Sequence, residues 1–98
     1  MLLAATVSRV STPAPDAVLD RFAAVLADLA VRHGLSNLRH GGAGTIVADV
    51  ESGRTLMDMA LFELEAESLI GHEVFVVSSD APAAGTIVGD ALRAPAAA

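Results

Sequence analysis

Two acidic residues two positions apart, Asp49 and Glu51, have the spacing that most directly suggests chemistry in this chain. In an extended strand, residues i and i+2 point to the same side, so both carboxylates could face one Mg²⁺ ion. An acid pair of this kind is also a common feature of a solvated strand end. The following residues 52–54, Ser-Gly-Arg, are typical of a turn, which favours the solvated strand end over metal catalysis.

A glycine-rich segment at residues 40–44, His-Gly-Gly-Ala-Gly, precedes this acid pair. Such a loop can cradle a phosphate with bare backbone amides, which makes Gly41, Gly42 and Gly44 candidates for nucleotide binding. That role needs a helix N-terminus or a lysine after the loop, whereas an alternating strand pattern follows here. Glycine also adopts the positive φ values that hairpin turns require, so we favour an antiparallel hairpin.

The three histidines show no metal-ligand spacing. His33 is predicted to end a helix, and no ligand-type residue lies three or four positions before it. His40 and His72 have no ligand-spaced companions, so we predict that both are surface residues and that the chain holds no metal site. Arg54 is predicted to bridge acids near the turn, which is a structural role.

Composition excludes several classes of function. The chain has 98 residues, no cysteine, and a formal net charge of -6. A negative charge is the wrong sign for holding a nucleic-acid backbone, and no apolar run approaches the length of a membrane span. The absence of cysteine excludes thiol catalysis and fits a reducing cytoplasm. Alanine supplies much of the apolar fraction, so the core is thin and a partner surface is expected to complete it.

Apolar spacing predicts the first half of the chain. A helix is expected from residue 15 or 16 to His33, ended by Gly34, because large apolar residues recur every three or four positions. Strands are expected at residues 35–39 and 45–51. The apolar side of this helix consists of Leu19, Phe22, Leu26, Leu29 and Ala30.

A second helix is signalled more strongly. Thr55 and Asp58 form a capping-box-like start, and Gly71 supplies the stop. The helix is apolar over so much of its circumference that we predict burial on two sides. One predicted face contains Leu56, Met59, Ala60, Phe62, Ala66, Leu69 and Ile70, and a second face contains Met57, Leu61 and Leu64. The predicted solvated strip contains Asp58, Glu63, Glu65, Glu67 and Ser68.

The remaining segments complete one α/β (α+β) domain that spans residues 1–98. Residues 73–78 are nearly all apolar, which predicts a central strand covered on both faces. Residues 83–93 are predicted to be a weak helix, because two glycines lie inside it. Residues 1–14 are expected to form an edge strand or a frayed arm, and residues 94–98 a frayed tail. The expected architecture is a small mixed sheet of three to four strands with two to three helices.

This order of elements resembles the core of the minimal nucleotidyltransferase family. The resemblance covers roughly residues 25–92, and its most specific part is the sequence of residues 50–59, Val-Glu-Ser-Gly-Arg-Thr-Leu-Met-Asp-Met. The Leu/Glu-rich segment 61–70 and the sequence Gly-His-Glu-Val-Phe-Val-Val at 71–77 are similar to the family's helix and last strand. The resemblance implies a nucleotidyltransferase-like fold, with Mg²⁺ and ATP as the family's cofactors.

The family's chemistry depends on residues that this chain replaces. Its members carry a Gly-Ser loop and two carboxylates that hold Mg²⁺ on a nucleotide triphosphate, with a third acid on the last strand. Aligned on residues 53–55, these three acid positions fall at Ala43, Thr45 and Phe75, none of which can ionise. The loop is also about nine residues shorter in this alignment, a length that follows from the motif registration. The resemblance therefore implies a degenerate site without catalytic residues.

Two classes of function remain. The first is an interaction subunit without catalysis, since proteins of this family often serve as antitoxins paired with an all-helical HEPN ribonuclease toxin. Without a partner, a homodimer is expected, with Met57, Leu61 and Leu64 at its interface. The second is an active or nucleotide-binding minimal nucleotidyltransferase that transfers AMP from ATP with Mg²⁺, through Asp49, Glu51 and the glycine-rich loop.

Overall fold

The computed structural model describes residues 12–81 and 89–94. Its element order is α2 (Asp16–Arg21), α3 (Ala23–Arg32), β1 (Leu35–Gly42), β2 (Thr45–Val50), α4 (Leu56–Ile70) and β3 (Phe75–Ser78). The described residues form the small mixed α+β fold that the sequence predicts. No helix among them is long and apolar enough to cross a membrane.

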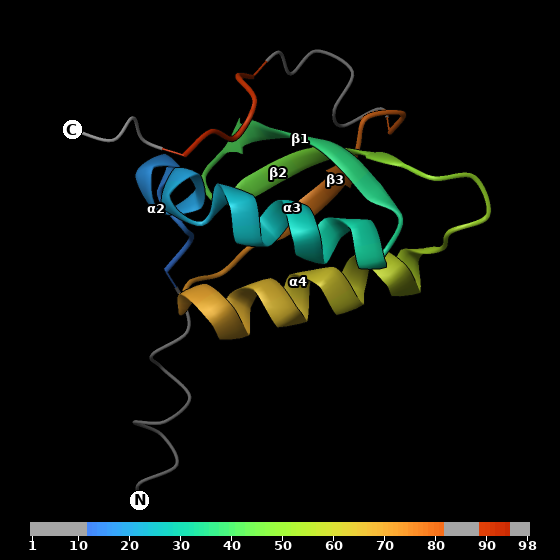
Figure 1. Cartoon of the computed structure of the whole chain (residues 1–98), viewed down its shortest axis with the longest axis horizontal. Coiled ribbons are helices and arrows are strands. Elements are labelled where there is room, and N and C mark those ends of the chain that lie inside the picture. The colour runs from blue at the N-terminus through green and yellow to red at the C-terminus, as the bar shows by residue number, and fades with distance from the viewer. Residues whose placement is uncertain (1–11, 82–88, 95–98) are drawn as a thin grey trace, which may run out of the picture.

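The three strands form one sheet in the order β1-β2-β3. β1 and β2 are antiparallel, and β2 and β3 are parallel, with α4 as the connection between them. Figure 1 shows α3 lying across the sheet and α4 running along the β3 side of the molecule. The strand predicted to be central, residues 73–78, is therefore an edge strand, and β2 is the central one.

The hairpin that joins β1 and β2 confirms the prediction for residues 40–44. Gly42 pairs with Thr45, so the turn consists of Ala43 and Gly44 alone. Both turn residues have positive φ, 50° and 80° respectively, as a type I′ hairpin turn requires. The glycine-rich segment thus extends β1 to Gly42, three residues beyond its predicted end.

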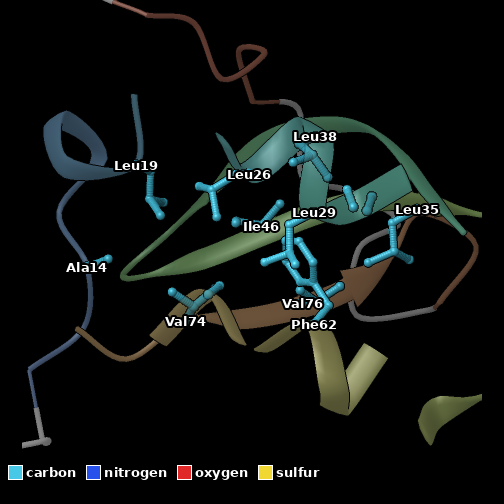
Figure 2. Close-up of a cluster of buried hydrophobic side chains, with 13 residues drawn as sticks. Ala14, Leu19, Leu26, Leu29, Leu35, Leu38, Ile46, Phe62, Val74 and Val76 are labelled. Carbon is cyan, nitrogen blue, oxygen red and sulfur yellow. The ribbon is translucent and has the colours of Figure 1, made fainter. Parts of the chain in front are cut away.

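The core lies between the sheet and the two long helices. Figure 2 shows Phe62 of α4 at the centre of the cluster, near Leu29 of α3 and Val76 of β3. Burial of such side chains contributes about 1.5–3 kcal/mol each, so this cluster is the main source of stability. The fully buried large residues are Phe62, Leu19, Leu26, Leu35, Ile46 and Val74.

The first predicted helix is interrupted at Phe22, which has φ -100° and ψ 16°. The backbone amide of Phe22 still donates to Val18, and its carbonyl still accepts from Leu26. The helical hydrogen-bond pattern therefore continues through the break between α2 and α3. Leu19 and Leu26, on either side of it, are both fully buried as predicted.

A helix was predicted at residues 83–93. Residues 82–88 lie outside the described part of the chain, and for residues 89–93 the prediction is wrong. Residues 89–94 are extended along the outer edge of β1. The amide of Leu92 donates to the carbonyl of Leu38, and the amide of His40 donates to the carbonyl of Asp90. The predicted arm at residues 1–14 is described only from Thr12, and Pro13 forms a parallel bridge with Glu73.

Two glutamates of α4 cap the outer edge of β3. The carboxylate of Glu63 accepts a 2.7 Å hydrogen bond from the amide of Val76, and that of Glu67 accepts a 3.1 Å bond from the amide of Val74. Residues i and i+4 of a helix are about 6 Å apart along its axis, which is close to the distance between residues i and i+2 of a strand. The spacing of Glu63 and Glu67 therefore matches the spacing of the amides of Val74 and Val76. Both glutamates were predicted to be solvated, and the structure corrects this.

We expect Glu63→Ala to lower the free energy of unfolding by about 1–3 kcal/mol, because the partly buried amide of Val76 loses its acceptor. Glu63→Gln keeps a carbonyl oxygen at this place and should cost clearly less. Urea denaturation measures both values. Equal losses in the two variants would contradict the role of the hydrogen bond, and Ser68→Ala, at an exposed position on the same helix, is the matched control.

Candidate functional site

The outer face of α4, formed by Met57, Leu61 and Leu64, is the most unusual surface among the described residues. These side chains remain 66%, 41% and 63% exposed, respectively. Each large apolar side chain left in water forgoes about 1.5–3 kcal/mol of burial free energy. Contiguous apolar surface of this kind marks interaction sites on soluble proteins.

Local interactions fix where α4 begins and ends. The amide of Met57 donates to the hydroxyl of Thr55 at 3.2 Å, and the amide of Thr55 donates to Asp58 at 2.9 Å. This is the predicted capping box. Gly71, with φ 75°, ends the helix in the left-handed conformation, as predicted.

The rotation of α4 about its axis is fixed from two directions. Phe62 and Ala66 are fully buried against the core, and Glu63 and Glu67 are held at the edge of β3. Successive residues of a helix turn by about 100°, so Met57, Leu61 and Leu64 then point away from the core. Burial on two sides was predicted, and within the described chain only one side is covered.

The first predicted face of α4 is also narrower than expected. Leu56, Ala60 and Leu69 were assigned to the buried face, yet all three are exposed. Leu56 is the first residue of the helix and precedes the point where α4 reaches the core. Met59 and Ile70 pack partly against the buried cluster, so the covered face is a strip of four residues centred on Phe62 and Ala66.

Arg54 bridges the two acids that flank the start of α4, as predicted. Its Nε donates to Glu51 at 3.0 Å, and its Nη1 lies 3.4 Å from Asp58. The hydrogen bond to Glu51 raises the pKa of Arg54 above its ordinary value. A hydrogen bond from the backbone of Thr55, together with the charge of Arg54, lowers the pKa of Asp58.

The two acids with metal-ligand spacing, Asp49 and Glu51, have different partners. Asp49 accepts hydrogen bonds from Ser79 at 2.7 Å, Arg39 at 2.9 Å and Asn37 at 3.2 Å. These bonds, the one from Ser79 first, hold the pKa of Asp49 below its ordinary value. Glu51 is engaged by Arg54, so each carboxylate is already balanced by a different arginine.

The three positions that the resemblance aligns with catalytic acids lie together at one end of the sheet. Thr45 and Phe75 pair directly across the parallel strands β2 and β3, and Ala43 is in the turn before β2. Phe75 is 45% exposed. The arrangement places an apolar ring and a hydroxyl where two-metal phosphoryl transfer would need carboxylates.

Close packing explains two of the candidate phosphate-binding glycines. A Cβ atom on Gly44 would lie 3.0 Å from the carbonyl oxygen of Glu73 and also 3.0 Å from the side chain of Pro13. A Cβ atom on Gly41 would lie 2.9 Å from the side chain of Thr45. Gly42, by contrast, has open space beside it and a φ of 87°, which glycine adopts without strain.

His40 is not the surface residue that was predicted. Its side chain is 11% exposed and lies between two aspartates of α2, with Nε2 2.7 Å from Asp20 and Nδ1 3.4 Å from Asp16. Asp20 also accepts a 3.0 Å hydrogen bond from the amide of Arg93. This hydrogen bond, followed by the one to His40, lowers the pKa of Asp20.

The other two histidines are also partly enclosed. His33 lies 3.1 Å from Glu65 and contacts Phe62 edge to face, so it joins the end of α3 to α4. The predicted role of His33 as a helix-terminal residue is confirmed. His72 is half-buried, and its Nδ1 has no hydrogen-bond partner among the described residues. Residues 12–81 and 89–94 contain no group of three or more metal-ligand side chains that could hold a metal ion.

Sequence reasoning missed the partners of these sites, because they are distant in the chain. Asp20 lies in the first predicted helix, and nothing near it in sequence points to His40 or Arg93. Ser79 likewise reaches Asp49 across 30 residues. Only Asn37 carried a local signal, since asparagine tolerates the positive φ of 54° that it adopts in β1.

Comparisons with known proteins find no match: no family model, no curated protein and no solved structure matches this chain.

We expect Asp20→Ala to loosen the attachment of residues 89–94 to the rest of the fold, because Asp20 holds both His40 and the amide of Arg93. Hydrogen exchange of the Arg93 amide should become faster. The pKa of Asp20 is lowered in the folded state, so its stabilising effect is present at neutral pH and is lost as the pH falls through that lowered pKa.

The effect of Asp20→Ala on stability should accordingly be largest near neutral pH and vanish in acid. Asp28→Ala, at an exposed acid on α3, is the matched control. An unchanged exchange rate at Arg93 in Asp20→Ala would show that Asp20 does not anchor this segment.

We expect the purified protein neither to hydrolyse ATP nor to transfer AMP with Mg²⁺ or Mn²⁺, because Ala43, Thr45 and Phe75 supply no carboxylate to hold a metal ion. Phosphate release and transfer of labelled AMP to protein are the measurements. Metal-dependent turnover that Asp49→Asn abolishes would contradict this expectation and favour the nucleotidyltransferase function.

Proposed function

We propose that this protein is an interaction subunit without catalytic activity, and that a second polypeptide covers the outer face of α4. The observation that carries the proposal is the exposure of Met57, Leu61 and Leu64 on a helix whose rotation is fixed by its own core and edge contacts. The helix cannot turn these side chains inward without releasing Phe62 from the core.

The state of the candidate catalytic positions supports the same proposal. The acids Asp49 and Glu51 are each neutralised by an arginine, and the glycine-rich segment is a tight hairpin turn. The positions aligned with the family's acids are occupied by Ala43, Thr45 and Phe75. These features favour binding of a protein over phosphoryl transfer.

The resemblance to minimal nucleotidyltransferases suggests one type of partner. In that setting the chain would be the antitoxin of a HEPN ribonuclease toxin, and both would work in the cytoplasm, which the absence of cysteine fits. A second copy of the chain is the other possible cover, since a two-fold dimer buries one self-complementary patch on both subunits. In either case the interaction site is the outer face of α4.

A photo-crosslinking residue placed at position 64 tests the proposal in the native host. We expect a covalent adduct to one defined polypeptide, identified by mass spectrometry, because Leu64 is one of the three exposed residues that form the proposed site. The same residue placed at position 31 is the control, since Val31 is 71% exposed on α3. Adducts that are absent at positions 57, 61 and 64, or equal at position 31, would overturn the proposal.

A further inference from the structure

The charges on either side of the outer face of α4 all have one sign. At about 100° per residue, Glu63 and Glu67 lie along one margin of the face, and Asp58 and Glu65 lie along the other. α4 contains no lysine or arginine, and the sequence has none between Arg54 and Arg93. The exposed apolar stripe is therefore bordered by acids on both sides.

The contacts of these acids leave both margins negative. Asp58 shares Arg54 with Glu51, so this group of three residues keeps one negative charge. Glu65 is paired with His33, and its side chain is half exposed. Glu63 and Glu67 accept neutral backbone amides at the edge of β3, and these contacts leave their full charges in place.

This distribution of charge discriminates between a second copy of the chain and a different protein as the partner of this face. In any face-to-face pairing of α4 with α4 of a second copy, acidic margins meet acidic margins, whichever direction the helices run. Like charges at such close range oppose association. Their repulsion offsets the free energy that burial of the apolar stripe would contribute to a dimer. A partner whose apolar stripe is bordered by lysine or arginine would bury the apolar residues and also attract the acidic margins.

We propose that the outer face of α4 binds a cationic amphipathic helix of another protein, with its apolar stripe on Met57, Leu61 and Leu64 and its basic residues on both acidic margins. The inference rests on the proposed function and adds the chemistry of the partner. A helix is the fitting shape because residues 57, 61 and 64 form a straight i, i+4, i+7 stripe, the pattern by which one helix packs along another. The basic margins would set the partner's orientation and speed its association.

Three labelled synthetic peptides of about 18 residues test this, a length that supports a helix on binding. The first has a leucine stripe bordered by lysines, the second has the same composition in scrambled order, and the third has glutamates in place of the lysines. Fluorescence anisotropy at low and high salt measures binding to the full chain. We expect binding of the first peptide only, weakened by salt.

Variants of the protein locate the binding site. Leu64→Ser and the triple variant Glu63→Gln, Glu65→Gln, Glu67→Gln should each weaken binding about tenfold, the first through lost apolar contact and the second through lost charge. Glutamine keeps the acceptors that Val74 and Val76 use, and Glu65→Gln alone serves if the triple variant is unstable. Val31→Ser and Asp28→Asn on α3 are the matched controls and should bind normally.

Other results overturn the inference in distinguishable ways. Equal binding of the scrambled or acidic peptide, or no binding of the lysine peptide, would show that basic margins on a helix are not recognised. A dimer of the protein alone, seen by sedimentation and abolished by Leu64→Ser but not by Val31→Ser, would assign the face to a second copy. That last result would leave the proposed function intact, whereas absent crosslinks at positions 57, 61 and 64 would remove the function itself.

Discussion

The hydrogen bonds from the edge of β3 to two glutamates of α4 are the constraint on which the rest of the structure depends. An open strand edge is costly, because its amides lose water on packing and because it can pair with other chains. Here Glu63 and Glu67 accept those amides at 2.7 and 3.1 Å. The same bonds fix the rotation of α4. Closing the edge therefore turns Met57, Leu61 and Leu64 toward solvent. The same two hydrogen bonds thus protect the sheet and present the proposed interaction face.

Local signals were sufficient for the turns and helix ends of this fold. Thr55 and Asp58 predicted the capping box, Gly71 predicted the helix stop, and the glycines at residues 40–44 predicted the hairpin, because each acts through its own backbone within a few residues. The order of strands in the sheet is a different matter. An apolar strand can be covered by helix and side chains while it lies at an edge, so the composition of β3 did not distinguish an edge from a centre.

The candidate site was predictable only in part, for a related physical reason. The outer face of α4 follows from helical spacing, and the sequence showed that this helix is too apolar for a small sheet to cover. The role of Glu63 and Glu67 could not be predicted, because the sequence of a helix does not show that a distant strand donates hydrogen bonds to its glutamates. His40 was misassigned for the same reason, since its partners Asp16 and Asp20 belong to a distant helix.

The acids of β2 and of α4 have different contacts, and this difference favours a binding surface over a catalytic one. Catalytic carboxylates must keep oxygen atoms free for metal or substrate, whereas both oxygens of Asp49 already accept bonds from Arg39, Ser79 and Asn37. Its lowered pKa reflects these structural bonds. On α4 the acids keep their charge beside exposed apolar side chains, which is an arrangement for recognising a surface of opposite charge. The binding surface that we propose for this chain therefore lies on α4 and not on the strands.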